Sequence, residues 1–561
     1  MSDFEHESDV VIVGSGAAGL VAGLVVAEQG LRCLVLEKSD LVGGSSGLSG
    51  GGLWLPVNPL MRAAGVADTV DDARRYLEAI IGDVGPASSP ARQEAFLRAA
   101  PELVAFLQRS GVRLVRSAGY PDYHPDRPGA SVAGRCVEAG IVDGRRLGPW
   151  LAKLRIRPGA VTLPFYNREI PLLGLTRRTV RGFWTAVRVR WRRFGRTLLR
   201  QTPLTGGASL VAQLLQANLR RGTEVWLQCP VVELIVRDDR VAGVIAERDR
   251  RRLRIGAARG VLLAAGGFAR NEQMRQQYHP HPISATWSMA APTDTGDSIR
   301  AGMAIGAATA LMDDAWWGPS LLLPGGIAAF TLRERSLPGS IIVDHSGARF
   351  MNESASYVEC GHRIYQRNEH VSAVPAWLVI DDKHRRRYPF VMLRPGRTPD
   401  TIVESGFLKR AASLAELASQ IGVDPDGLAA TVRRFNRFAA TGRDEEFHRG
   451  DTGYDRFYGD PRVKPNPNLG AIDTPPYYAS AIYPGDLGTK GGLLTDEHAR
   501  VLRDDATAIP GLYAAGNTTA SVMGRTYPGP GCTLGAATVF AYLAARHAIG
   551  DNHGESRAHP E

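Results

Sequence analysis

The N-terminal end of the chain places short apolar runs and glycines in an order typical of a nucleotide-binding unit. Residues 9–13 read Asp-Val-Val-Ile-Val, the composition of a strand buried on both faces. A glycine-rich stretch over 14–19 follows, then a helical pattern that stops at Gly30. A second apolar strand over 33–36 ends at Glu37. This order predicts a parallel strand–helix–strand unit.

The glycines between the first strand and the helix have the G-x-G-x-x-G spacing of a dinucleotide-binding turn. The first glycine permits the tight turn, the second lets the backbone approach a pyrophosphate, and the third lets the helix pack on the strand. Glu37 stands about 20 residues further on, where an acid accepts hydrogen bonds from an adenosine ribose. The turn residues predicted to contact the dinucleotide are Gly14, Ser15, Gly16, Ala17, Ala18 and Gly19.

The uncharged run 10–27 has the length of a transmembrane helix, which is the alternative interpretation of this end of the chain. Its glycine spacing favours the nucleotide-binding unit, and the acidic residues before it lack the basic character of a signal peptide. No other stretch reaches the length of a membrane span. The five cysteines are far apart and form no C-x-x-C pair, so we expect a reducing compartment and no metal site.

Apolar patterning continues with a helix over Leu204–Arg220 and a strand meander over 224–263. Residues 316–485 differ in composition, with scattered Trp, Pro and His. Glycine-rich segments return after them and continue to a final helix at about Leu534–Ile549. The polar tail Asp551–Glu561 is expected to be disordered.

These segments predict an α/β protein in which a Rossmann-like domain is split by an inserted α+β catalytic domain. The expected bounds are 1–315 and 486–561 for the two parts of the nucleotide-binding domain and 316–485 for the catalytic domain. A basic, helix-rich insertion is expected at about 150–200 within the first part.

Three more glycine-rich places predict that both ends of the chain bind one cofactor, which favours FAD over NAD. They are Gly43-Gly44-Ser45-Ser46, Ala264-Ala-Gly-Gly267 and Gly511-Leu-Tyr-Ala-Ala-Gly516-Asn517. For Asp297, which is also a candidate contact, an ordinary helix N-cap is an equal interpretation. The contacts predicted beyond the first turn are Glu37, Lys38, Gly43, Gly44, Ser45, Ser46, Val232, Ala265, Gly266, Asp297, Gly516, Asn517 and Leu534.

This bipartite arrangement resembles the FAD-binding domain of the fumarate reductase-like flavoproteins. The Arg and His clusters with which fumarate reductases hold dicarboxylates have no evident equivalent here. Several stretches instead resemble the 3-ketosteroid Δ1-dehydrogenases, and the likeness covers nearly the whole chain except about 150–200. The stretches are Ser49-Gly-Gly-Gly-Leu-Trp54-Leu-Pro56, Tyr120-Pro-Asp-Tyr123, Asn352-Glu-Ser-Ala-Ser-Tyr357, Pro484-Gly-Asp-Leu-Gly-Thr-Lys-Gly-Gly492 and Tyr527-Pro-Gly-Pro-Gly531-Cys-Thr-Leu534-Gly535.

The resemblance implies an FAD-dependent 1,2-dehydrogenation of 3-ketosteroids and four catalytic positions. The Tyr527 hydroxyl and the Gly531 N–H would hold the enolate oxygen, and Tyr357 would take the proton from carbon 2. Tyr123 would stabilise the tyrosinate or relay the proton. The hydride from carbon 1 would pass to flavin N5, and an external acceptor such as a quinone would reoxidise the cofactor.

The surroundings of these positions are less well defined by the sequence. Asp122 and His124 flank Tyr123 and are expected to be solvated loop residues. A steroid needs a long apolar slot, and core packing is an equal interpretation for every candidate wall residue. These candidates are Trp54, Trp316, Trp317, Phe350 and Leu534.

Three other functions stay open at this point. Dehydrogenation at carbons 4 and 5, as in the Δ4-(5α)-dehydrogenases, is one, although Tyr123 in its motif favours the Δ1 reaction. The others are a fumarate reductase-like activity and a membrane-bound flavin carrier or steroid-binding module without turnover.

The formal charge of +10 is concentrated in residues 176–200, which hold nine Arg and no acid. This argues against a nucleic-acid partner for the protein as a whole. On a helical wheel, the apolar residues of this segment form one stripe and Arg covers the other faces. We therefore expect a helix that binds an anionic membrane surface, at the cytoplasmic face of the cell membrane. Packing on the protein's own core, or another partner, is the alternative. The stripe comprises Val180, Phe183, Trp184, Val187, Trp191, Phe194 and Leu198.

Overall fold

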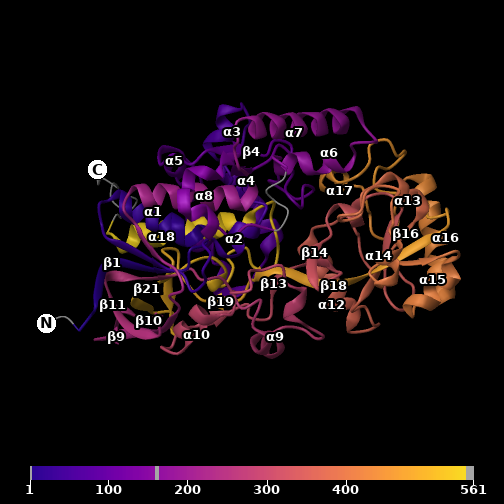
Figure 1. The fold of residues 1–561 in the computed structure, drawn as a ribbon. Helices are drawn as coiled ribbons and strands as arrows, with labels where there is room; N and C mark the ends of the chain where they lie inside the picture. Colours follow the sequence, from indigo (N-terminus) through magenta and orange to yellow (C-terminus); the bar gives the residue numbers. More distant parts are fainter. Residues whose placement is uncertain (1–2, 158–162, 551–561) are drawn as a thin grey trace, which may run out of the picture.

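The computed structural model describes residues 3–157 and 163–550. The predicted tail Asp551–Glu561 therefore lies outside the described residues. Two large sheets organise the described chain, one in each half of the molecule in Figure 1. The domain bounds 1–315, 316–485 and 486–561 stay a prediction.

An eight-stranded sheet carries the nucleotide-binding motifs. Its order is β20–β21–β11–β1–β2–β8, and β10 and β9 extend it through antiparallel pairing that begins at β11. Strand β1 pairs in parallel with β2 and β11, and β11 pairs in parallel with β21, so both ends of the chain meet in one sheet. The strands are β1 (His6–Val13), β2 (Cys33–Leu36), β8 (Glu224–Trp226), β9 (Val231–Arg237), β10 (Arg240–Arg248), β11 (Arg251–Leu263), β20 (Arg500–Leu502) and β21 (Ala508–Ala514).

In the turn after β1, the first and third glycines of the motif have no room for a side chain. These are Gly14 and Gly19. Gly14 has φ +108°, and a side-chain carbon there would overlap the Ala264 carbonyl of the neighbouring strand. A side-chain carbon at Gly19 would overlap the Gly14 carbonyl. Residues 10–27 thus form a strand, a tight turn and a helix. The predicted strand–helix–strand unit is confirmed, and the transmembrane alternative for this run is wrong.

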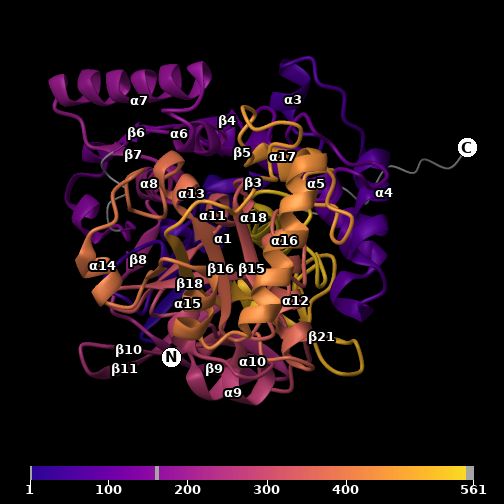
Figure 2. The same cartoon turned by 90° about the vertical axis from the view of Figure 1, so that its right-hand side faces the viewer.

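Helices cover this sheet, with α1 packed between α8 and α18, as the views of Figure 1 and Figure 2 agree. Helix α8 begins at Gly206 because Leu204 pairs with Val142 in a small sheet. Helix α18 begins at Cys532, two residues before the expected start. The helices are α1 (Ala17–Glu28), α2 (Gly44–Leu48), α3 (Pro59–Ala63), α4 (Val70–Ile81), α5 (Pro90–Arg109), α8 (Gly206–Arg220), α9 (Glu272–Tyr278), α10 (Asp297–Met303) and α18 (Cys532–Ala548).

The second large sheet is antiparallel and has the order β14–β13–β18–β16–β15, with β17 also paired to β18. Its strands are β13 (Ala315–Leu323), β14 (Ile327–Phe330), β15 (Ser340–Val343), β16 (Ala376–Asp381), β17 (Lys409–Ala411) and β18 (Tyr477–Thr489). Its helices are α11 (Arg333–Ser336), α12 (Tyr357–Asn368), α13 (Asp382–Arg387), α14 (Asp400–Glu404), α15 (Leu414–Ile421), α16 (Pro425–Thr441) and α17 (Gly453–Phe457).

Smaller elements connect these layers. The basic insertion forms α6 (Ile170–Gly174) and α7 (Val180–Leu198), and Figure 2 shows α7 along one outer edge with α6 beneath it. Three small sheets comprise β3 (Gly52–Trp54) with β4 (Leu114–Arg116) and β5 (Cys136–Ala139), β6 (Val142–Asp143) with β7 (Pro203–Leu204), and β12 (Thr309–Ala310) with β19 (Gly492–Leu493). Short 3₁₀ helices lie at Gly85–Ser88, Gly144–Lys153, Asn167–Glu169, Ala285–Trp287 and Gly516–Thr518.

Candidate active site

The glycine turn and the acid of the second strand meet at the start of α1. The Ser15 N–H and hydroxyl donate to Glu37 Oε2 at 3.1 and 2.6 Å, and the Glu37 side chain is buried. Ser15 Oγ also accepts from the Gly43 N–H at 3.1 Å. Gly16 caps α1 without a side-chain hydrogen bond and stays partly accessible. The N-terminus of α1 can therefore receive a phosphate group.

A second layer of contacts comes from the segment after Gly43 and from the end of β11. Ser46 Oγ accepts from the Ala17 N–H at 3.0 Å, and the Ser45 hydroxyl donates to Asp294 at 2.7 Å. Burial raises the pKa of Asp294 to about 7, although the Ser45 hydrogen bond opposes the rise. Ala265, Gly266, Gly44 and both serines remain partly accessible.

The C-terminal segment contacts the end of β11 and lines a cavity. The carbonyl of Gly266 accepts a hydrogen bond from Thr518 at 2.9 Å, which joins the β11 end to the 516–518 turn. The Trp316 Nε1–H donates to Asn517 Oδ1 at 3.1 Å. Gly516, Asn517 and Leu534 are all partly accessible. The narrow cavity at this place is lined by Trp316, Thr489, Lys490, Gly516, Asn517, Thr533, Ala536 and Ala537, together with residues of the 519–522 turn and the buried Arg92 and Phe540.

Three further predicted cofactor contacts come from segments outside the glycine turn. They are Lys38, Asp297 and Val232. Lys38 Nζ forms an ion pair with Asp297 Oδ2 at 2.6 Å, which joins the second strand to α10. Gly296 is the N-cap of α10 and Asp297 its first residue, so the stretch Thr295-Gly-Asp297 is a helix start, and the contact of Asp297 with the cofactor stays a prediction. Val232 is 41% exposed on β9, and its contact with the cofactor stays a prediction.

These features fit FAD. The N-terminus of α1 is partly accessible and suits a pyrophosphate, a buried carboxylate stands at the ribose position, and strands from both ends of the chain lie in one sheet. FAD would be held by the turn 14–19, by Glu37, by the 43–46 segment and by the 516–517 turn.

Three tyrosines from distant segments pack together beside the cavity that Trp316 lines. Tyr123 lies in a loop, Tyr357 is the first residue of α12, and Tyr527 precedes α18. Their ring centroids are 5.5 Å apart for Tyr123–Tyr357, 5.3 Å for Tyr123–Tyr527 and 4.8 Å for Tyr357–Tyr527. Each side chain is at most 5% exposed. Trp316, which donates to Asn517 in the cofactor cavity, packs edge-on against Tyr527 at 5.2 Å.

Gly531 follows Tyr527 and presents its backbone at the start of α18. Its φ is +85°, and a side-chain carbon would overlap the backbone of Gly52 on β3. Its carbonyl accepts the Trp54 N–H at 3.1 Å, whereas its own N–H has no acceptor among the described residues. This N–H is therefore available to an oxygen of a ligand.

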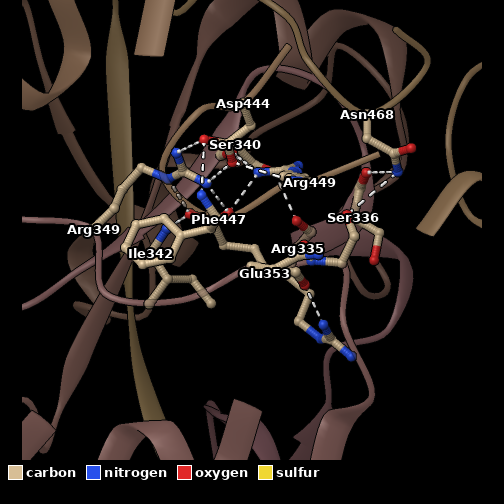
Figure 3. Close-up of polar contacts among 12 residues, drawn as sticks. Arg335, Ser336, Ser340, Ile342, Arg349, Glu353, Asp444, Phe447, Arg449 and Asn468 are labelled. Atoms are coloured by element: carbon tan, nitrogen blue, oxygen red, sulfur yellow. Dashed lines mark hydrogen bonds and ion pairs between the residues drawn. The ribbon is translucent and has the colours of Figure 1, made fainter. Parts of the chain in front are cut away.

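A buried network of charges holds the turn that precedes Tyr357, as Figure 3 shows. Arg335 donates to backbone carbonyls of this turn, among them that of Glu353. The Glu353 carboxylate accepts from Arg349 at 2.8 and 2.7 Å and from Arg449 at 3.1 Å, and the three charged groups are fully buried. Because removing one partner of such a group leaves a buried unpaired charge, this network fixes the start of α12.

Burial controls the acidity of the tyrosines. It raises the pKa of Tyr357 well above the ordinary tyrosine value, and the neighbouring Tyr527 raises it further. The pKa values of Tyr123 and Tyr527 are also raised, again chiefly by burial. Because all three hydroxyls are protonated at pH 7, Tyr357 must lose its own proton before it can accept one from a substrate.

This chain is similar to known flavoproteins over nearly its whole length. A family model described as an FAD binding domain matches residues 9–534. The 3-oxosteroid 1-dehydrogenase of Mycobacterium tuberculosis is 45% identical over 98% of this chain and 99% of its own. The solved 3-ketosteroid Δ1-dehydrogenase of Sterolibacterium denitrificans, in complex with 1,4-androstadiene-3,17-dione, is 39% identical with a TM-score of 0.93, over 98% of this chain and all of its own. This chain belongs to the 3-ketosteroid Δ1-dehydrogenases.

The fold of these dehydrogenases extends to more distant flavoproteins. A flavocytochrome c3 fumarate reductase shares the fold at a TM-score of 0.62 and 22% identity, over 98% of this chain and 79% of its own. The predicted fold class, a split Rossmann-like FAD-binding domain with an inserted α+β part, is confirmed, as are FAD and the dehydrogenase family.

In this dehydrogenase the surroundings of Tyr123 differ from the expected solvated loop. Asp122 is fully buried, accepts from the Trp54 Nε1–H at 2.7 Å and pairs with Arg135 at 2.8 Å. Burial raises the Asp122 pKa to about 6, against the effect of Arg135. His124 is partly buried, and burial lowers its pKa to about 4. The expectation is wrong for Asp122, because its partner Trp54 comes from a distant part of the sequence, whereas His124 is a partly accessible loop residue.

Sequence reasoning missed three further tyrosines of this cluster. Tyr454 packs on Tyr123 at 4.4 Å between ring centroids, and the hydroxyls of Tyr120 and Tyr458 are 2.6 Å apart. Tyr454 and Tyr458 are four residues apart at α17, a spacing that puts two side chains on one helix face and could have drawn attention to them.

Some of the residues predicted to line the steroid slot lie in the core, and others border the candidate site. Trp54 stacks on Phe96 at 6.0 Å in the core, and Trp317 is likewise buried there. Trp316 borders the tyrosine cluster, and so does Phe330, which the sequence did not single out and which packs edge-on to Tyr357 at 5.1 Å. Phe350 is attached to the core of the second sheet, and Leu534 is partly accessible.

Proposed function

We propose that this chain oxidises the bond between carbons 1 and 2 of a 3-ketosteroid and releases the 1-ene-3-one. The observation that carries the proposal is the meeting of the Tyr123, Tyr357 and Tyr527 rings at one buried place beside the cofactor cavity. Gly531, four residues after Tyr527, adds an N–H that has no acceptor among the described residues. A 3-keto group acidifies carbon 2 because the charge left by its proton spreads onto the ketone oxygen.

Some of these residues remove the proton from carbon 2, and others bind the ketone oxygen. The Tyr527 hydroxyl and the Gly531 N–H bind the ketone oxygen and stabilise its developing charge. Tyr357 first gives up its hydroxyl proton, which Tyr123, packed against it, leads away, and the resulting tyrosinate takes the proton from carbon 2. FAD, when bound, supplies the acceptor for the hydride that leaves carbon 1. An external acceptor such as a quinone, which reoxidises the enzyme, stays a prediction.

Tyr123 in its motif Tyr120-Pro-Asp-Tyr123 supports the Δ1 reaction over dehydrogenation at carbons 4 and 5. A fumarate reductase-like activity has less support, because the buried Arg residues near Tyr357 are already bound to Glu353 and to backbone carbonyls. A flavin carrier without turnover would not need a free backbone N–H beside three buried phenols.

The test is anaerobic mixing of the holoenzyme with 5α-androstane-3,17-dione, a saturated 3-ketosteroid. We expect the flavin absorbance to bleach and the product to carry its new double bond between carbons 1 and 2. A product unsaturated between carbons 4 and 5 would establish the alternative reaction. Absence of bleaching with this steroid and with androst-4-ene-3,17-dione would support a binding module, and turnover of dicarboxylates would indicate a fumarate reductase.

We also propose that helix α7 attaches the enzyme to an anionic membrane surface. The apolar stripe of α7 points outward, with Trp184 59% and Trp191 73% exposed. The inward face consists of small residues and Val189, and Arg192 pairs there with Glu169 at 2.7 Å. No helix in the described ranges is both long and apolar enough to cross a bilayer.

Vesicle sedimentation tests this attachment. A variant with Phe183, Trp184, Trp191 and Phe194 changed to Ser should keep its fold, because all four side chains are more than half exposed. We expect its affinity for phosphatidylglycerol vesicles to fall about tenfold or more, since burial of one such side chain contributes about 1.5–3 kcal/mol. Val236→Ser, which removes an exposed apolar side chain on β9, is the control and should bind as wild type. Equal binding of the quadruple variant would contradict the proposal.

A further inference from the structure

Lys490 is a buried cation at the wall of the cofactor cavity. The proposed chemistry does not use this residue. It follows the last strand residue of β18 and is fully buried. Its Nζ lies 4.9 Å from the ring centroid of Trp316, the residue that also contacts Asn517 and Tyr527. Lys490 therefore borders the place where the cofactor cavity and the tyrosine cluster meet.

The only carboxylate paired with Lys490 in the described chain is that of Asp314. Lys490 Nζ and Asp314 Oδ2 are 3.3 Å apart, and neither atom makes a well-oriented hydrogen bond within the described residues. Asp314 Oδ1 is occupied by the Ala315 N–H at 2.9 Å and by His362 Nε2 at 2.8 Å. An ammonium has three N–H donors, so Lys490 keeps donors that its surroundings do not use.

The electrostatics of the pair keep Asp314 ionised. Burial opposes the charge on Asp314, but Lys490 and then His362 lower its pKa to about 2. Burial lowers the pKa of Lys490, and the ionised Asp314 opposes that change. A second buried cation at the same cavity, Arg92, donates to the Ala520 carbonyl at 3.2 Å and to that of Ala87. Arg92 Nε also lacks a hydrogen-bond partner among the described residues, but the Arg92 guanidinium lies over the Phe540 ring. Lys490 lies over Trp316, which packs against Tyr527, and is therefore the cation beside the tyrosine cluster.

We propose that Lys490 raises the reduction potential of bound FAD by holding a positive charge at the cavity that gains negative charge when the cofactor is reduced. A charge acts strongly there because the cavity wall is buried and its effective dielectric is far below that of water. The effect on function is direct, because a saturated C–H bond gives up a hydride only to a sufficiently oxidising acceptor. Asp314 holds the ammonium in place and limits its net charge.

A redox titration of the holoenzyme against a reference dye, without steroid, tests the proposal. Lys490→Met should lower the two-electron midpoint potential by at least 30 mV, since about 30 mV corresponds to a tenfold change in the redox equilibrium. Lys490→Arg keeps the charge and should stay close to wild type. Lys383→Met is the matched control, because it removes a lysine that pairs with the half-exposed Asp473 at 2.7 Å outside the cavity. Its potential should not change.

A second neutral variant and a measurement of FAD affinity separate the outcomes. If Lys490→Met and Lys490→Gln both retain FAD and both keep the wild-type potential, the proposal is wrong. If both lose FAD altogether, Lys490 holds the cofactor and does not set its potential, which also overturns the proposal. Because the titration contains no steroid, its result does not depend on the proposed 1,2-dehydrogenation.

Discussion

Tyr357→Phe is expected to lower the rate of flavin bleaching by a 3-ketosteroid about 10²–10⁴-fold, the usual contribution of a general base. The substitution removes only the hydroxyl. The ring keeps its edge-on contact with Phe330 at 5.1 Å and its place beside Tyr527, so the fold and FAD content should not change. Anaerobic stopped-flow measurement of the flavin absorbance gives this rate directly.

The pH profile gives an independent signature of the same residue. Burial raises the pKa of Tyr357 above its ordinary value, so its basic form is scarce at pH 7 and increases as the pH rises. Because the ordinary tyrosine pKa is about 10, kcat/KM of the wild type should rise through the alkaline range without levelling off below that pH. Tyr357→Phe should lose this rise.

Tyr365→Phe is the matched control, since Tyr365 lies on the same helix and is also buried. Its hydroxyl donates to the Pro282 carbonyl at 3.3 Å and its ring packs on Trp317, away from the tyrosine cluster. The control should bleach at the wild-type rate. Bleaching of Tyr357→Phe as fast as the wild type would exclude Tyr357 as the base.

Tyr527→Phe should lower kcat about 10²–10³-fold, because it removes one of the two donors to the ketone oxygen. The Gly531 N–H remains, which sets the lower limit of the loss. The phenyl ring keeps its edge-on packing against Trp316 and its contact with Tyr123. Since the lost hydrogen bond strengthens as charge develops on the oxygen, kcat should fall far more than KM rises.

Steady-state kinetics with androst-4-ene-3,17-dione measure this difference. Tyr513→Phe serves as control, because Tyr513 is a buried tyrosine of β21 whose hydroxyl is hydrogen-bonded to His547 at 2.9 Å. The control should retain wild-type kcat. A Tyr527→Phe variant with a raised KM and unchanged kcat would mean that Tyr527 contributes to binding and not to stabilisation of the enolate.

Features set by local spacing could be predicted from the sequence. The order of strand, glycine turn, helix and second strand up to Glu37 depends on contacts between residues close together in the chain, and the structure confirms it. The amphipathic stripe of residues 176–200 follows from helical periodicity in the same way. The site tyrosines were found by their motifs and not by any spacing, so their roles rest on the family resemblance.

The tertiary structure decided which partners those residues have. Only the fold buries Asp122 against Arg135, brings Tyr454 onto Tyr123 and directs the α7 stripe outward. Only the fold places Lys490 at the cofactor cavity beside Asp314. Helical and strand periodicity arise from the backbone of neighbouring residues, whereas burial and charge pairing depend on which distant surfaces the packed sheets and helices bring into contact.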